Sequence, residues 1–120
     1  MTENATTERR PQYAVFIYEA VPPEDLPPDV MAGHIGLPEK IAAAGGRVVA
    51  GLGFQDPSTT TAVRGDLLTD GPFVETKEAL AGIYVLEARD LDHALELARM
   101  TPIVSGGVEV RPLVDFQVLP

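Results

Sequence analysis

Residues Ala81–Met100, AGIYVLEARDLDHALELARM, join the two patterns that decide the fold of this chain. The run Ala81–Ala88 is rich in apolar, aromatic and β-branched residues, which predicts a buried strand. Asp90 can then cap a helix, and Thr101-Pro102 can end it. The apolar stripe of this helix is predicted at Leu91, Ala94, Leu95 and Ala98. We therefore expect a strand followed directly by a helix.

Further strands are predicted on both sides of this unit. Their positions are Tyr13–Tyr18, Arg47–Phe54, Thr60–Arg64 and Val108–Leu113. A helix is expected between the first two of them. The resulting order is that of an α+β, ferredoxin-like fold, β-α-β-β-α-β, with an extra hairpin within residues 55–71.

The earlier helix is expected to begin at Asp29, a good N-cap residue, and to stop at Gly45-Gly46. Its inward positions, at helical spacing, are Val30, His34, Leu37, Ile41 and Ala44. Pro38 lacks an amide hydrogen and clashes with the carbonyl four residues earlier. We therefore expect either a kink or two helical pieces.

Both faces of the predicted sheet are apolar, although two helices can cover only one face. Ile83 and Val85 point to one side of their strand, and Tyr84 and Leu86 point to the other. Apolar surface left in water costs roughly 25 cal/mol per Å². We therefore expect the second face to pack against another copy of the chain in a homodimer. The alternative is that the extra hairpin and the C-terminal tail fold back over that face.

Composition narrows the class of protein. The chain has 120 residues with 45% hydrophobic and 22% charged residues, which is ordinary for a soluble globular protein. Its length predicts one domain, residues 11–120, and the polar residues 1–10 are expected to form a flexible tail. The formal net charge of −9 disfavours nucleic acid and anionic membranes as partners.

The sequence lacks the patterns typical of membrane spans, secretion signals, transition-metal sites and nucleotide-binding loops. No apolar run is long enough to cross a bilayer, and the N-terminus lacks a secretory signal, so we expect a cytoplasmic protein with no membrane partner. With no Cys and two His, a transition-metal site within one chain has little support, and a subunit-bridging or carboxylate-rich site is the alternative. Walker A and dinucleotide-binding patterns are also missing, and no metal or cofactor is expected.

The segment Thr69–Val74, TDGPFV, has two interpretations. Asp70 and Gly71 are typical of a tight turn whose exit Pro72 fixes, and this explains every residue type without a site. The same carboxylate also stands beside a charged stretch that comprises Glu75, Lys77 and Glu78. A proton-transfer site at a loop is the second interpretation.

Of the two histidines, His34 is the more informative. It lies on the inward stripe of the earlier helix, so its imidazole should be buried. It is then either a core histidine bonded to the backbone or a general acid or base tuned by burial and by a neighbouring carboxylate. His93 lies off the predicted stripe of its own helix and is expected on the solvated surface.

Glu109 and Arg111 share one face of the last strand, opposite Val108 and Val110. Buried charges are seldom unpaired, so this face should be wet, paired or part of a polar cavity. The Arg111 guanidinium suits a carboxylate. Asp70 or Glu109 of the chain itself is the expected partner, and an anionic ligand is the alternative.

The sequence resembles the YCII-related family, in the branch named after an Asp-Gly-Pro-Phe (DGPF) motif. The resemblance rests on Asp70–Phe73, on the segment VETKEALAGIYVLEARDLDHALELA that follows, and on Glu109–Pro112. YAVFIY and AAAGGRVVAGLGF extend it loosely over the rest of the chain. The family resemblance implies a ferredoxin-like α+β fold assembled as a dimeric α/β barrel.

The resemblance says less about activity. A His–Asp pair in a cleft has been proposed as the active centre of YCII-like proteins, and a relative acts in chloroaromatic breakdown. Other members of this branch are encoded with, or fused to, alternative sigma factors. Asp70 matches such a pair through the motif, and His34 is its counterpart, although the segment MAGHIGLPEK differs from the usual first helix.

Two functions follow. The first is a small cofactor-free enzyme that performs elimination, isomerisation or cyclisation on a small metabolite, with Asp70 and His34 as acid/base groups. Its ligand-binding residues would be Arg111, Lys77, Phe73 and Tyr84. The second is a non-catalytic dimeric module that binds a metabolite or another protein and is linked to sigma-factor regulation.

Overall fold

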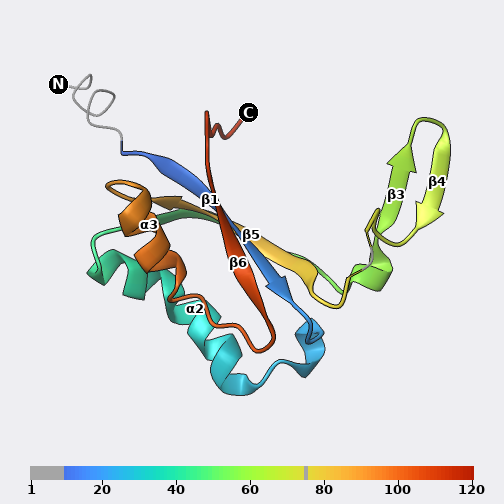
Figure 1. The fold of residues 1–120 in the computed structure, drawn as a ribbon, viewed down its shortest axis with the longest axis horizontal. Coiled ribbons are helices and arrows are strands. Elements are labelled where there is room, and N and C mark those ends of the chain that lie inside the picture. The colour runs from blue at the N-terminus through green and yellow to red at the C-terminus, as the bar shows by residue number, and fades with distance from the viewer. Residues whose placement is uncertain (1–9, 75) are drawn as a thin grey trace.

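The chain folds as a four-stranded antiparallel sheet that carries two helices on one face and a separate hairpin (Figure 1). We describe residues 10–74 and 76–120 of a computed structural model. The main-sheet strands are β1 (Gln12–Glu19), β2 (Arg47–Gly53), β5 (Ala79–Glu87) and β6 (Gly106–Pro112), in the order β2-β5-β1-β6. The helices are α2 (Pro28–Ala43) and α3 (Leu91–Ala98), with single turns at Pro23–Asp25 and Pro57–Thr59. The predicted ferredoxin-like fold is confirmed.

The extra hairpin is an arm that stands apart from the main sheet (Figure 1). It consists of β3 (Thr61–Arg64) and β4 (Leu67–Asp70), which pair with each other. The sequence predicted the first of these strands, whereas the second was expected only as part of a hairpin region. We call residues 61–70 the arm.

Helix α2 differs from its prediction in two respects. It begins at Pro28 with Pro27 at the N-cap, so Asp29 lies in the first turn and does not cap the helix. It also continues through Pro38 as one helix, and the two-piece alternative is therefore wrong. Because Pro38 has no amide hydrogen, the carbonyl of His34 loses its usual helical donor. The predicted stop is confirmed: the helix ends at Ala43, and Gly45 has a φ of 91°, which favours glycine.

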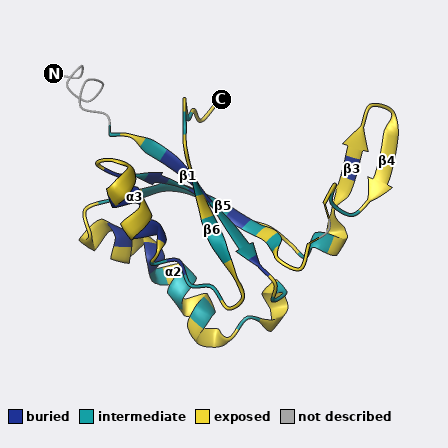
Figure 2. Cartoon of the chain, in the orientation of Figure 1, coloured by how far each residue is buried: buried dark blue, intermediate teal, exposed yellow. Residues whose placement is uncertain are grey.

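The core lies between the helices and one face of the sheet, shown in dark blue in Figure 2. Its fully covered members include Val15, Ile41, Leu86 and Leu97. In α3 the buried side chains are His93, Ala94, Leu97 and Ala98, whereas Leu91 and Leu95 are exposed. The predicted stripe of α3 was thus half wrong, because its helix is turned so that His93 and Leu97 face the core.

The opposite face of the sheet, here called the open face, carries no helix (Figure 1). Cross-strand neighbours place Leu52, Ile83 and Phe16 in one row on this face. Leu52 is 61% exposed, and Ile83 and Phe16 are partly exposed. The arm projects away from this face, and Val114 and Val118 of the C-terminal segment are exposed, so neither covers it as the alternative expected.

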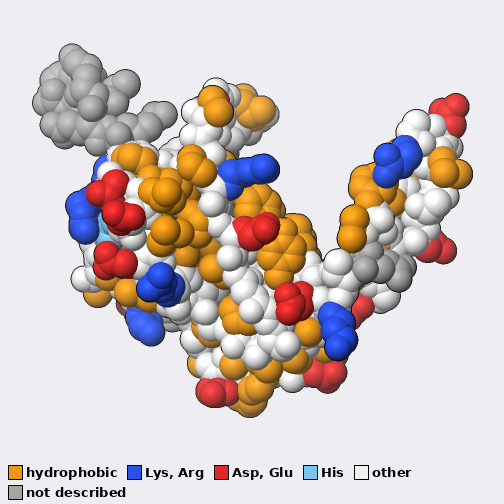
Figure 3. Space-filling view, viewed as in Figure 1, with side chains coloured by type: hydrophobic (Ala, Val, Ile, Leu, Met, Phe, Trp, Pro, Cys, Tyr) orange, Lys and Arg blue, Asp and Glu red, His pale blue; other side chains and the backbone are white. Residues whose placement is uncertain are grey.

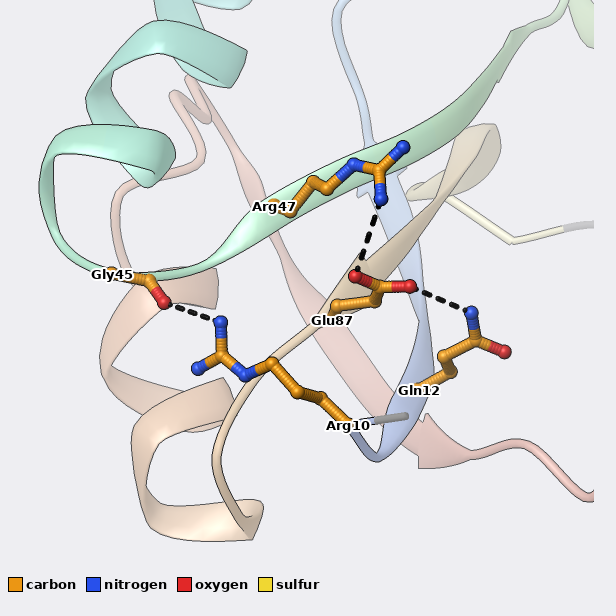
Figure 4. A network of polar contacts seen from close by, with 5 residues as sticks. All are labelled: Arg10, Gln12, Gly45, Arg47 and Glu87. Atoms are coloured by element: carbon orange, nitrogen blue, oxygen red, sulfur yellow. Dashed lines mark hydrogen bonds and ion pairs between the residues drawn. The ribbon is translucent and has the colours of Figure 1, made fainter. Parts of the chain in front are cut away.

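Polar contacts link three strands at the end of the sheet where β1 and β2 begin and β5 ends (Figure 4). Glu87 accepts a hydrogen bond from Gln12 at 3.0 Å and lies 3.7 Å from the Arg47 guanidinium. Arg10 donates to the carbonyl of Gly45 at 2.7 Å. Of the predicted flexible tail, residues 1–9 lie outside the described residues, whereas Arg10 is held against the α2–β2 turn.

Candidate functional site

A pocket of about 410 Å³ lies between α2 and the helix-covered face of β2 and β5. His34 lines it from α2, Glu19 from the end of β1, and Tyr84 from β5. The rest of the lining is mostly apolar and includes Leu37, Val48 and Met31. We call this space the helix-side pocket. It brings one imidazole and one carboxylate to the edge of an apolar volume.

The pocket exists because strand β2 carries glycine where side chains would fill it. Gly51 pairs with Tyr84, and Gly53 pairs with Gly82, so both glycines stand at positions that face the helices. A Cβ built on Gly51 or Gly53 would meet no atom within 4 Å. Their φ angles are not positive, so other residues fit the backbone. Side-chain size at these two positions therefore sets the pocket volume.

Glu19 is a fixed negative charge beside this pocket. Its side chain is buried, at 7% exposure, and accepts hydrogen bonds from three backbone amides: Val104 at 2.7 Å, Ser105 at 2.9 Å and Val21 at 3.2 Å. Burial alone raises the pKa of Glu19, but the amide hydrogen bonds outweigh it and hold the pKa below its ordinary value. Glu19 is therefore ionised at neutral pH.

His34 is the titratable group that the helix brings to the pocket. It is partly buried, and burial is the main reason why its pKa lies below the ordinary value for histidine. The negative charge of Glu19 and the backbone of Pro102 act in the opposite direction and partly offset this effect. At neutral pH the imidazole is thus neutral and can accept a proton, and the Glu19 carboxylate favours the cation that forms.

Close packing positions His34. A Cβ built on the preceding Gly33 would lie 2.8 Å from the Pro102 ring, so α2 approaches the loop after α3 closely at this point. The same loop supplies Thr101, whose hydroxyl lies 2.8 Å from the Tyr84 hydroxyl. Tyr84 is buried, and burial raises its pKa despite the Thr101 hydrogen bond. Tyr84, predicted to bind substrate, forms a wall of the pocket with its hydroxyl already engaged.

A second pocket, of about 370 Å³, adjoins the first at the end of β1 and shares Glu19, Val21 and Phe54 with it. Its other walls come from the turn after β2 and from the DGPF segment, through Gly71 and Pro72. Lys77, predicted to bind an anion, lines this second pocket. Gly71 and Pro72 of the motif thus line the second pocket, which adjoins the helix-side pocket that His34 lines.

The structure separates Asp70 from His34 within one chain. Asp70 is the exposed last residue of β4 and does not line the helix-side pocket. Gly71 has a φ of 89° and donates its amide to the carbonyl of Thr60, next to the Thr61–Asp70 pair of the arm. The tight turn of the hairpin lies instead at Gly65–Asp66, so the motif forms a glycine bend at the base of the arm and not the predicted hairpin turn. Phe73 lies under the Arg64 guanidinium, 4.5 Å from ring centre to Cζ, and this contact joins the motif to the arm. Glu75 lies outside the described residues.

Arg111 lies on the open face, also away from the helix-side pocket. It flanks a surface depression together with Tyr18 and Glu109. A hydrogen bond to Glu109 is the main cause that raises the pKa of Tyr18, and the positive charge of Arg111 opposes it. The expected Arg111 ion pair with Asp70 or Glu109 is not seen among the described residues, where the ion pair found joins Arg47 to Glu87.

The surface position predicted for His93 is wrong. His93 is 4% exposed; its Nδ1 accepts from the amide of Arg89 at 3.1 Å, and its Nε2 donates to the carbonyl of Ala44 at 2.9 Å. The second bond joins α3 to the end of α2. Both ring nitrogens are thereby engaged, which makes His93 a structural residue.

Sequence reasoning missed Glu19, the carboxylate that accompanies His34. The signal was an acid at the end of the apolar run YAVFIYE, where a buried charge needs partners. Its partners, the amides of residues 104 and 105, are remote in sequence and could not be read from it. Within residues 10–74 and 76–120, no group of three or more His, Asp or Glu side chains is arranged to hold a metal ion.

Comparison with known families agrees with this architecture. The model of the YCII-related domain matches residues 12–117. The chain belongs to the YCII-related family. An uncharacterised protein of Rhizobium meliloti (strain 1021) is 46% identical over 54 residues, which are 42% of this chain and 44% of that protein. This YCII-related chain therefore aligns with less than half the length of that relative. In the part of the chain that the structure describes, neither helix, α2 or α3, has both the length and the apolar character needed to span a bilayer.

Proposed function

We propose that this YCII-related chain is an enzyme whose helix-side pocket binds a small, largely apolar metabolite and whose His34 transfers a proton. One observation carries the proposal: a neutral, partly buried imidazole faces an apolar pocket beside a carboxylate that is held ionised. The neutral imidazole takes a proton from carbon or oxygen of the substrate and becomes a cation. Glu19 stabilises this cation by its charge, and the proton is returned at a second position or to water.

This chemistry covers elimination, isomerisation and cyclisation, and it uses only acid/base groups of the chain. Lys77 is the residue proposed to hold an anionic group of the substrate, because it lines the adjoining pocket. Glu19 takes the place that the sequence assigned to Asp70 as the carboxylate near His34. Catalytic roles for Asp70 and ligand contacts for Arg111 and Phe73 stay predictions that would require another copy of the chain.

Proton transfer can be tested before the substrate is known. Small cyclic ketones, lactones and 2-oxo acids are incubated with the protein in D₂O, and proton NMR follows the exchange of their acidic C–H groups. We expect exchange with at least one compound class and at least a hundredfold slower exchange with His34→Ala. Ile35→Ala is the matched control, because Ile35 is 79% exposed on the same helix. Equal exchange by His34→Ala and the parent protein would disprove the role of His34.

We also propose that the chain forms a homodimer through its open face. The chain has 8329 Å² of accessible surface, whereas a compact monomer of this mass exposes roughly 6300 Å². The arm and the segment after β6 contribute to this excess. A standard dimer interface buries roughly 800 Å² on each partner, so association can remove much of it. Light scattering at micromolar concentration should give twice the chain mass.

The residues Asp70–Phe73 support our assignment of the chain to the DGPF branch of the family. The cytoplasmic location stays a prediction. One observation favours the second function, a non-catalytic binding module: Gly71 serves the bend at the base of the arm, and Phe73 serves the contact with Arg64. Binding of a compound at the helix-side pocket without proton exchange in any compound class would favour that module.

A further inference from the structure

The arm exposes several apolar side chains to solvent, and an isolated hairpin gains no stability from them. Within it, Val63 is 60% exposed, Leu67 60% and Leu68 66%, and Ala62 is buried. An isolated two-stranded hairpin is at best marginally stable in water. Some other surface must therefore cover part of the arm for its apolar residues to contribute to stability.

The two faces of the arm differ. Strand pairing places Ala62 and Arg64 with Thr69 and Leu67 on one face, and the Arg64–Phe73 contact covers part of that face with the DGPF segment. The other face carries Val63 opposite Leu68, and Thr61 opposite Asp70. We call it the uncovered arm face. It consists of an apolar pair followed by a carboxylate.

The arm and the open face border one hollow. In Figure 1 the helices lie on one side of the main sheet and the arm rises on the other. Figure 3 shows a broad hollow between the arm and the body, with hydrophobic side chains on both of its sides. A pocket of about 600 Å³ between the body and the arm is lined by Tyr18 and Leu80 of the open face and by Thr60 and Pro72 at the base of the arm.

The dimensions of the chain agree with an incomplete assembly. Its radius of gyration is 16.2 Å and its longest extent is 50 Å, whereas a compact domain of this length has a radius of gyration of roughly 14 Å. A body that lies on the open face occupies the hollow and meets the arm. In a two-fold dimer each chain offers both surfaces and receives both, which closes the assembly.

We propose that the arm clasps a second copy of this chain, with Val63 and Leu68 packed against the partner subunit and Asp70 carried to the interface. This inference rests on the homodimer proposed above and adds an element to it. The arm thereby gains the apolar cover that its own chain does not supply. The DGPF segment, tied to the arm through Phe73 and Arg64, then links the clasp to the pocket that Lys77 lines.

The test uses the full chain and sedimentation over a concentration series. Val63→Ser with Leu68→Ser should raise the dimer dissociation constant roughly a hundredfold, because two apolar side chains lose their burial. Leu52→Ser on the open face should also weaken the dimer, by roughly tenfold. Ile35→Ser is the matched control, since Ile35 is more exposed than either arm residue but lies on α2. This control should leave the dissociation constant unchanged.

Hydrogen exchange separates clasping from a local change in the arm. The amides of residues 61–70 should exchange slowly in the parent dimer and at least tenfold faster in Leu52→Asp, in which the arm itself is unaltered but the dimer is broken. Equal protection in both proteins would overturn the clasp. A dimer weakened by Leu52→Ser but not by the arm variant would overturn the clasp and leave the dimer standing. A monomeric parent protein would overturn both, while the proton-exchange test of His34 stands apart.

Discussion

The two histidines occupy two regions of the same helix-covered side, and their surroundings differ. His93, in α3, lies against the end of α2, where it is buried and both of its ring nitrogens are hydrogen-bonded to backbone groups. In the middle of α2, His34 is partly buried, lines the helix-side pocket and is affected by the negative charge of Glu19. Complete satisfaction makes the first imidazole a structural link. The second imidazole borders open space, which the proposed proton transfer requires.

The largest expected effect is on stability, and it comes from Glu19, which lines the helix-side pocket and accepts hydrogen bonds from three backbone amides. Glu19→Ala should lower the free energy of unfolding by about 3–5 kcal/mol, because the buried amides of Val21, Val104 and Ser105 lose their acceptor. Urea titration measures this loss. Glu19→Gln retains one acceptor oxygen and should lose less. A loss of unfolding free energy below about 1 kcal/mol in Glu19→Ala would mean that water replaces the carboxylate. Glu19 would then not fix the structure on its side of the helix-side pocket.

The second prediction compares the histidines directly. His93→Ala should lower the free energy of unfolding by about 2–4 kcal/mol, through a cavity and the unpaired groups of Arg89 and Ala44. His34→Ala should change it by less than about 1 kcal/mol, because His34 is only partly buried. Thermal and urea unfolding of both variants provide the comparison. Similar losses in the two variants would break the distinction between a structural and a chemical histidine.

The third prediction concerns the space beside His34. Gly51→Val fills the helix-side pocket from a position where a Cβ meets no atom within 4 Å. Stability should therefore change by less than about 1 kcal/mol, whereas binding of any compound found in the exchange assay should weaken at least tenfold. Gly107→Ala is the control, since its Cβ also meets open space but lies outside this pocket. Undiminished binding in Gly51→Val would place the ligand elsewhere.

The smallest expected effect is on pH dependence. The pKa of His34 is lowered on folding, so the unfolded chain binds the proton more readily and stability should fall as the pH drops below about 6.5. The pKa of Glu19 is also lowered, and its contribution should be lost further into acid, below about pH 4.3. His34→Gln should flatten the stability curve between pH 7 and 5 without changing the more acidic part. An unchanged slope between pH 7 and 5 would contradict the burial of His34.

Local pattern was enough for much of the fold. The strand β5, the stop at Gly45 and the inward position of Leu37 and Ile41 follow from apolar spacing and turn chemistry, and the structure confirms them. The two faces of α3 were misassigned because an eight-residue helix offers a choice of stripes that differ by one position. The same choice of stripe placed His93 on the surface. Its acceptor, the carbonyl of Ala44, is 49 residues away in the chain, so no local pattern indicated its burial.

The sequence by itself determined the order of strands and helices, the glycine bend at Gly71 and the presence of an imidazole on the sheet-facing side of α2, because these depend on residues close together in the chain. Only the tertiary structure decided that Glu19, rather than Asp70, stands near His34. Its amide donors come from residues 104 and 105, which strand pairing of β1 with β6 brings to the end of β1. The pocket likewise depends on glycines of β2 lying opposite α2, and such long-range placement leaves no periodic trace in a sequence.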